Sequence, residues 1–291
     1  MHDYKYIDTH AHLNINTFND DVEEVIDRCR EESVAVINVG TQKDTSKRAV
    51  EIATEADNCF AIIGLHPVHT SASYHDEQEL GENMKTFTSR GEEFDAAYYR
   101  DLAKNPKVVA IWECGLDYYR LEKATRAVQE KAFIEQIELA NELNLPLMIH
   151  TRDAKGNSAS AKADAGVGNV YDDTYEILKA HSKVRGNIHF YAGNWEQAKK
   201  FFDIGFSVSF TGVITFAKDY EEVVKNAPLD LIHGETDCPY VAPVPYRGQR
   251  CEPWMVKEVY KRIADIRGDN EEKVREQLME NARQLYKLPG V

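Results

Sequence analysis

Short runs of apolar, often β-branched residues alternate along this chain with longer charged segments whose apolar positions recur every three or four residues. The first pattern is typical of buried strands and the second of amphipathic helices, so their alternation predicts a parallel sheet with crossover helices. The runs predict eight strands, at residues 4–8, 34–39, 60–65, 108–112, 146–150, 187–190, 207–210 and 229–234.

Helical periodicity fills most of the intervals between these strands and continues after the last one. It predicts helices at residues 20–32, 44–56, 125–144, 172–181, 194–204, 220–226 and 253–266. The clearest is 125–144, where Phe133, Ile137 and Ala140 fall on one face. Two more helices, at 76–88 and 94–104, are predicted inside the long polar connection that follows the third strand.

Eight strands in this order favour a closed α/β barrel of the TIM type, (β/α)8, over an open doubly wound sheet, which would leave two unpaired edges. No glycine-rich phosphate loop follows the first strand, which counts against a dinucleotide-binding fold. Such a barrel typically takes about 250 residues, so residues 1–291 are predicted to form a single domain. Residues 153–170, rich in small and polar types, predict a flexible loop insertion, either a lid or a tolerated surface insertion.

The amino-acid composition limits the classes of protein to which the chain can belong. The hydrophobic share of 43% and the charged share of 29% are typical of a soluble globular protein, and no segment approaches the roughly 18 apolar residues of a membrane span. The amino terminus shows no secretory signal, so we expect a cytoplasmic protein that does not contact membranes. Five scattered cysteines indicate reduced thiols rather than a disulfide framework.

The formal net charge of −14 argues against a protein that binds duplex nucleic acid through a broad electropositive surface. It leaves a nuclease open, because divalent cations and a few local Arg or Lys residues can hold phosphate inside an acidic protein. No obligate protein partner is evident from the sequence, since the acidic surface shows no distinct partner patch.

Candidate chemistry begins at the end of the first predicted strand, in Asp8-Thr9-His10-Ala11-His12. Two histidines at i and i+2 face one side of an extended segment and can chelate a metal, although such a pair is common by chance. What strengthens the prediction is that metal-binding residue types recur at the carboxyl ends of other predicted strands, the rim where barrel active sites are assembled. They are His66, Glu113, His150, His189 and Asp237.

The mixture of imidazoles and carboxylates suits zinc, manganese or a related transition metal better than calcium, and magnesium that keeps some of its waters is a further option. More than four candidate ligands favour two ions that share a bridging carboxylate. Such a pair can clamp the attacking and leaving oxygens of a phosphoryl transfer.

Several segments in order resemble one family, the TatD-type metal-dependent deoxyribonucleases of the amidohydrolase-like barrel superfamily. The segments are DTHAH at 8–12, GLHP at 64–67, ECGLDYY at 113–119, LPLMIHTRDA at 145–154, HFYAG at 189–193, ETDCPYVAP at 235–243 and PYRGQRCEP at 245–253. The resemblance implies a divalent-metal-dependent hydrolase that cleaves phosphodiester bonds of DNA through metal-activated water. It further implies a 3′-to-5′ exonuclease whose substrate is a single-stranded end.

The resemblance also implies which residues hold two ions, whether magnesium, manganese or zinc. One ion is assigned to His10, His12, Glu113 and Asp237, and the other to Glu113, His150 and His189. Glu113 would bridge the two ions, Asp237 would orient the attacking water or take its proton, and Glu235 would support the ligands.

Three residues are predicted to face the substrate. His66 matches the family position near the phosphate, where it would contact the phosphate or protonate the leaving group; the alternative is that it only pins its loop. Arg152 and Arg247 are predicted phosphate contacts because a guanidinium matches phosphate geometry, with surface salt bridges as the alternative. Together with Asp237 and Glu113, His66 completes the predicted catalytic set.

The sequence departs from the family pattern at Trp112, where glycine is more usual, at HFYAG in place of HCFSG, and at Cys251 in place of asparagine. None of these changes removes a predicted ligand, so they bear on substrate preference. Two other functions stay open. One is an amidohydrolase of a small cyclic amide or ester, although the fourth strand ends in Glu113 rather than a carbamylated lysine. The other is a non-catalytic scaffold that keeps a metal for stability.

Overall fold

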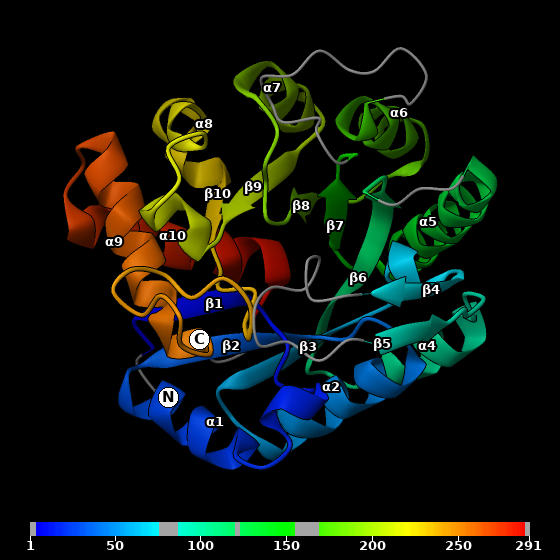
Figure 1. Ribbon diagram of the computed structural model, residues 1–291, viewed down its shortest axis with the longest axis horizontal. Coiled ribbons are helices and arrows are strands. Elements are labelled where there is room, and N and C mark those ends of the chain that lie inside the picture. The colour runs from blue at the N-terminus through cyan, green and yellow to red at the C-terminus, as the bar shows by residue number, and fades with distance from the viewer. Residues whose placement is uncertain (1–3, 76–86, 120–122, 155–168, 289–291) are drawn as a thin grey trace.

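Eight parallel strands form one sheet in the computed structural model, which describes residues 4–75, 87–119, 123–154 and 169–288 (Figure 1). Each strand hydrogen-bonds to the next in chain order. The strands are β1 (Tyr6–Ala11), β2 (Val34–Val39), β3 (Cys59–Ile63), β6 (Val108–Asp117), β7 (Leu147–Arg152), β8 (Gly186–Ile188), β9 (Phe206–Phe210) and β10 (Ile232–Gly234). Each of the eight predicted strands has its counterpart and the predicted barrel is confirmed, but residues 229–231, predicted as strand, form a 3-10 turn before β10.

The barrel closes where β1 meets the chain that follows β10. The backbone N–H of Asp237 donates to the carbonyl of His10 at 2.9 Å, and that of His12 donates to the carbonyl of Cys238 at 3.0 Å. Below these bonds, the buried carboxylate of Asp8 accepts from the backbone N–H of Thr236 at 2.8 Å and from its hydroxyl at 2.5 Å. The closing seam therefore includes three of the predicted metal ligands, His10, His12 and Asp237.

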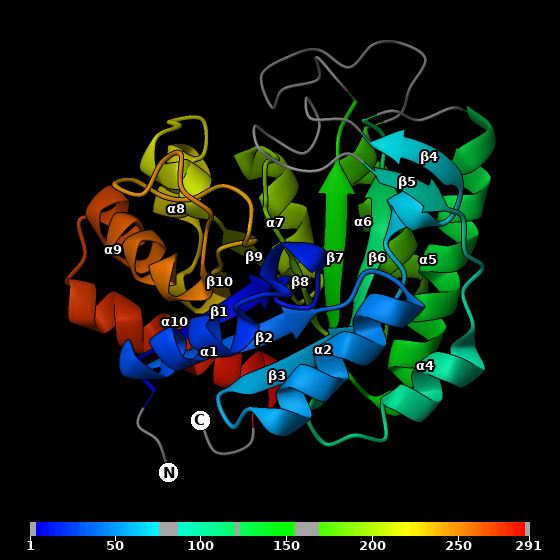
Figure 2. The ribbon, with the colours of Figure 1, turned by 60° about the horizontal axis from the view of Figure 1, so that its bottom comes forward.

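Helices cover the outside of the barrel, as the two views show (Figures 1 and 2). They are α1 (Val22–Glu31), α2 (Lys43–Glu55), α4 (Ala96–Leu102), α5 (Lys123–Leu143), α6 (Val170–His181), α7 (Trp195–Asp203), α8 (Glu221–Asn226), α9 (Val256–Arg267) and α10 (Glu271–Tyr286), with the 3-10 turns η1 (Asn16–Phe18), η2 (Pro67–His69), η3 (Gly212–Thr215), η4 (Leu229–Leu231) and η5 (Pro253–Met255). None of the helices in the described residues is long and apolar enough to cross a bilayer.

The apolar core has two parts, because successive residues of a strand point to opposite faces. Outward-facing strand residues such as Val36 and Ile63 pack against the surrounding helices. Inward-facing residues such as Ile37 and Ile62 fill the barrel together with Met279 and Tyr286 of α10. Helix α10, which the sequence analysis did not predict, thus packs against the barrel interior.

Two local predictions need comment. Residues 87 and 88, placed in a helix by the sequence, belong to strand β5 (Phe87–Arg90), which pairs antiparallel with β4 (Ala72–His75). The helix prediction is wrong there, because the backbone groups of this segment find partners across a ladder instead. Residues 76–86 and 155–168, which hold the rest of that helix and most of the predicted insertion, lie outside the described residues. The described chain resumes at Asn169, and α6 begins at Val170.

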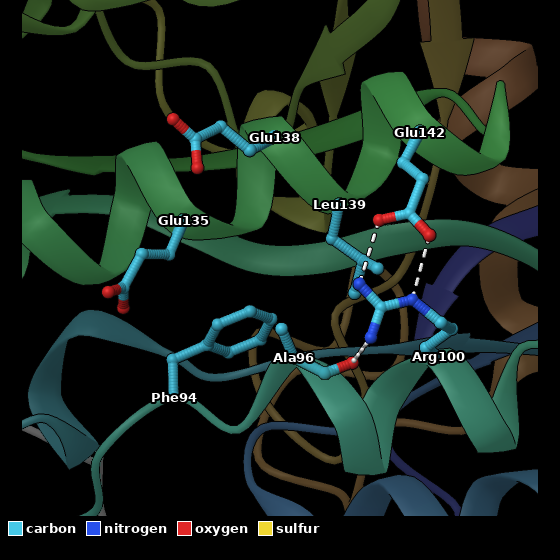
Figure 3. Close-up of a pocket in the computed structure, with 7 residues that line it drawn as sticks. All are labelled: Phe94, Ala96, Arg100, Glu135, Glu138, Leu139 and Glu142. Atoms are coloured by element: carbon cyan, nitrogen blue, oxygen red, sulfur yellow. Dashed lines mark hydrogen bonds and ion pairs between the residues drawn. The ribbon is translucent and has the colours of Figure 1, made fainter.

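The hollow between α4 and α5 is a surface groove of about 300 Å³ (Figure 3). Arg100 of α4 crosses it and donates two hydrogen bonds of 2.7 Å to the carboxylate of Glu142 on α5. The groove contains no histidine and only outer-helix and loop residues line it, so it is separate from the predicted metal ligands.

Candidate metal centre

Three candidate ligands meet where the barrel closes. The Nε2 atoms of His10 and His12 lie 3.0 Å apart, and Oδ1 of Asp237 lies 3.5 Å from the first and 3.4 Å from the second. Asp237 adopts a left-handed backbone conformation, with φ of 57°, which few non-glycine residues take. Its N–H is bonded to the carbonyl of His10, so the closing seam fixes the carboxylate beside both rings.

Hydrogen-bond partners assign the proton on two of the histidines. Nδ1 of His12 lies 3.0 Å from the carbonyl oxygen of Val39, which only accepts, so Nδ1 carries a proton and, in the neutral ring, Nε2 presents a lone pair. Nε2 of His150 lies 2.9 Å from Oδ2 of Asp117, so Nε2 donates and Nδ1 presents its lone pair toward Glu113, 3.9 Å from Oε1. Both free lone pairs therefore face a neighbouring candidate ligand.

His66 has the opposite proton arrangement. Its Nδ1 accepts a hydrogen bond of 3.0 Å from the backbone N–H of Val68, so the proton of the neutral ring is on Nε2. That Nε2 lies 3.5 Å from Oε1 of Glu113. The pKa of His66 is lowered well below its ordinary value, first by burial and then by the histidines around it. The ring therefore offers the centre a hydrogen-bond donor rather than a ligand lone pair.

Glu113 lies at the middle of the arrangement, inside β6 rather than at its end. The predicted strand ended at Trp112, but pairing with β7 carries β6 on to Asp117, with Gly115 opposite His150. Oε2 of Glu113 is buried and has no hydrogen-bond partner among the described residues. Burial raises the pKa of this carboxyl to about 7. A buried carboxylate with an unpaired oxygen is costly unless a cation compensates it.

His189 lies closer to the first group than to the second. It follows β8, and its ring stacks on that of His10 with 4.0 Å between centroids, whereas the centroids of His150 and His189 are 6.1 Å apart. Nδ1 of His189 lies 3.2 Å from Oε1 of Glu235, which also accepts the backbone N–H of Phe190 at 2.7 Å. The structure thus groups His189 with His10 and Glu235, while the family resemblance assigns it to an ion with Glu113 and His150.

Trp112, the departure from the family's glycine, lies beneath these rings. Its fully buried indole packs edge-on against His10 at 4.9 Å and against His189 at 4.6 Å between centroids. It also belongs to the apolar cluster inside the barrel. The large side chain therefore packs beneath the two imidazoles without replacing a ligand.

These residues fit divalent metal ions. Three groups of side chains have nitrogen or oxygen atoms within 4.8 Å of one another: His10, His12 and Asp237; His10, His189 and Glu235; and His66, Glu113 and His150, in which His66 contributes a hydrogen-bond donor. Burial lowers the pKa of His10 well below its ordinary value and that of His189 to about 3, so both rings are neutral and can donate electron pairs. Neutral imidazoles with buried carboxylates are the donor set that zinc and manganese accept.

The two predicted phosphate contacts, Arg152 and Arg247, both stack on aromatic rings. The guanidinium of Arg152, at the end of β7, lies 4.0 Å from the centre of the Tyr119 ring. That of Arg247 lies 4.1 Å from the centre of the Phe216 ring. Each guanidinium therefore lies over the face of an aromatic ring, and this contact holds it in a defined plane.

Asp117 is the functional residue that the sequence analysis missed. Burial alone would raise its pKa, but the hydrogen bond and charge of His150 outweigh that effect and the pKa is lowered, so the carboxylate is ionised and orients the ring. A signal was present, since Glu113, Gly115 and Asp117 fall on one side of an extended segment. To use this signal, the predicted strand would have had to continue past Trp112.

Replacing Asp117 with asparagine should weaken metal binding by about 10- to 100-fold, because the amide no longer fixes the proton on Nε2 of His150. A competition titration against a fluorescent chelator measures this. Asp101→Asn, which removes an exposed carboxylate paired with Lys104, is the matched control and should bind as the wild type does. Unchanged metal affinity in Asp117→Asn would contradict the orienting role.

Comparison with known proteins places the chain in a family. The model of the TatD-related DNase family matches residues 7–287. The chain is 37% identical over 286 residues to the uncharacterized metal-dependent hydrolase YabD of Bacillus subtilis, covering 97% of this chain and 98% of that protein. It is 31% identical over 290 residues to the 3′-5′ ssDNA/RNA exonuclease TatD of Pantoea ananatis, covering 97% and 99%.

Among solved structures, the TatD homolog YjjV of Escherichia coli K12 matches with a TM-score of 0.78 at 23% identity, over 98% of this chain and 99% of that one. That likeness supports the fold, and the two sequence relatives span the whole barrel. The protein belongs to the TatD-related DNase family of metal-dependent hydrolases.

Proposed function

We propose that the protein is a nuclease that uses two divalent ions to remove nucleotides from the 3′ end of single-stranded DNA. The observation that carries this proposal is the pattern of protons around Glu113 and Asp237. Lone pairs of His12 and His150 face these carboxylates, while His66 presents a proton. Such a centre has both metal ligands and a hydrogen-bond donor for the phosphate, which suits hydrolysis of a phosphodiester.

In this proposal one ion is held by His10, His12, Glu113 and Asp237, and the other by Glu113, His150 and His189. When bound, the ions would supply positive charge that stabilises the attacked phosphate and acidifies a water. Oδ1 of Asp237 orients that water and accepts its proton. Nε2 of His66 donates toward the phosphate or its leaving oxygen, because its other nitrogen is occupied by Val68.

Single-stranded DNA is favoured as the substrate by two observations. The net charge of −14 disfavours electrostatic binding of a duplex over a broad surface. Binding of nucleic acid therefore depends on the ions and on a few cationic side chains such as Arg152 and Arg247. The Pantoea ananatis relative, which covers nearly the whole chain, is named a 3′-5′ ssDNA/RNA exonuclease.

Chelator-treated protein given Mn²⁺, Mg²⁺ or Zn²⁺ should shorten a single strand from its 3′ end. We expect a ladder of 5′-labelled products, and early release of a labelled mononucleotide when the label is at the 3′ end. A blunt duplex of the same sequence should be degraded more slowly, and the metal-free sample should leave every strand intact. Early release of the 5′ label, with a ladder of 3′-labelled products, would reverse the proposed polarity. Intact strands with every ion would exclude the nuclease.

A further inference from the structure

One aromatic side chain at the carboxyl-terminal rim of the barrel is left in solvent. Phe216 directly follows η3, the short helix after β9, and 45% of its surface is exposed. Among the Phe, Tyr and Trp residues whose side chains the structure describes, it is the one that is exposed. Val244, on the facing loop, is exposed to the same extent of 45%. Exposed apolar groups on the rim of a barrel that also carries candidate metal ligands indicate a contact surface.

The position of Phe216 is fixed by the loop that carries Asp237. Gly212 of η3 packs so closely on this loop that a Cβ atom there would lie 2.4 Å from the carbonyl oxygen of Val241. The hydroxyl of Thr215 accepts the backbone N–H of Val244 at 2.9 Å. The segment that carries the exposed ring is therefore held against Val241 and Val244, which follow the predicted metal ligand Asp237 by a few residues.

Arg247, on the same loop as Val244, packs its guanidinium against the Phe216 ring. Its guanidinium lies 4.1 Å from the centre of the Phe216 ring, and its Nη1 donates to the carbonyl of Ala242 at 2.9 Å. This bond uses one of the five guanidinium N–H groups, so the group can still donate to an anion. In a chain of net charge −14, a cation stacked on an exposed ring, on the loop that follows Asp237, is suited to a polyanion that also carries aromatic rings.

We infer that Phe216 and Arg247 form a nucleotide-binding subsite, in which the ring stacks on one base of the strand that enters the metal centre and the guanidinium contacts a phosphate. The inference rests on the proposed function and deepens it. Every base has a π face, so stacking on an aromatic ring adds affinity with little preference for sequence. Neither Phe216 nor Arg247 belongs to a candidate metal group, so the subsite should affect substrate binding rather than the chemical step.

The test combines Phe216→Leu, which keeps the apolar bulk and removes the ring, with single strands that lack one base at a defined distance from the 3′ end. In the wild type, one abasic position should raise KM by about tenfold, which corresponds to about 1.4 kcal/mol of lost stacking. In Phe216→Leu the intact strand should show that higher KM already, and the abasic position should have no further effect. The kcat should stay near that of the wild type.

Val128→Ala is the control, because Val128 on α5 is exposed to 44% and is also apolar. It should keep the wild-type response to the abasic strands. If Phe216→Leu keeps that response at every position while the wild type cleaves DNA, the subsite is overturned and the proposed function stands. If the wild type cleaves no nucleic acid with any ion, the proposed function fails and the subsite fails with it.

Discussion

Glu113→Gln should lower kcat for oligonucleotide cleavage by at least about a hundred- to a thousandfold, the loss typical of removing a group that stabilises transition-state charge. The amide keeps the volume of the side chain but removes the negative charge between His66 and His150, whose ring nitrogens lie 3.5 and 3.9 Å from Oε1. Steady-state cleavage of a labelled single strand, with the metal in excess, measures the effect.

Glu142→Gln is the matched control for this substitution, since Glu142 is an exposed carboxylate paired with Arg100 on the outer helices. It should cleave as fast as the wild type. Equal activity of Glu113→Gln and the wild type would remove Glu113 from the mechanism and with it the bridging role.

Asp8→Ala should lower the free energy of unfolding by about 3 kcal/mol, because it leaves buried donors without an acceptor at the barrel seam. The carboxylate is fully buried and accepts from Thr236 twice and from the backbone N–H of His10 at 3.2 Å. Denaturant unfolding of the metal-free protein measures this without a contribution from bound ions.

Thr9→Val removes a single hydrogen bond at the same seam, the 3.2 Å bond that the Thr9 hydroxyl donates to the carbonyl of Gly234. It should cost about 1 kcal/mol, the usual net contribution of one hydrogen bond. If Asp8→Ala costs no more than Thr9→Val, the Asp8 carboxylate does not hold the seam closed.

The strands were predictable because their pattern is local. Residues 34–39 are apolar at most positions, since a central strand of a barrel is buried on both faces, and the predicted strand coincides with β2 (Val34–Val39). Strand β6 was predicted too short because its last residues are held by pairing with β7, which the apolar run from Val108 to Trp112 does not show. Helix α10 was missed although Val274, Leu278 and Ala282 have helical spacing.

The candidate site was predictable in its residue types and not in its geometry. The recurrence of histidines and carboxylates at strand ends identified His10, His12, Glu113 and Asp237, which the barrel brings to one rim. Which ring nitrogen faces the centre depends on partners distant in sequence. The carbonyl of Val39 sets the proton of His12, and Asp117 sets that of His150. No local pattern specifies those contacts.

Counting bound metal while measuring cleavage on the same samples tests the two-ion nuclease most directly. Divalent ion is returned stepwise to chelator-treated wild type and Glu113→Gln, and each sample is assayed on a single strand with a labelled 5′ end. We expect cleavage by the wild type to appear as two ions bind per chain. Glu113→Gln should bind fewer ions and cleave at least about a hundredfold more slowly. Cleavage by metal-free protein, or wild-type cleavage rates in Glu113→Gln, would contradict a centre built on this carboxylate.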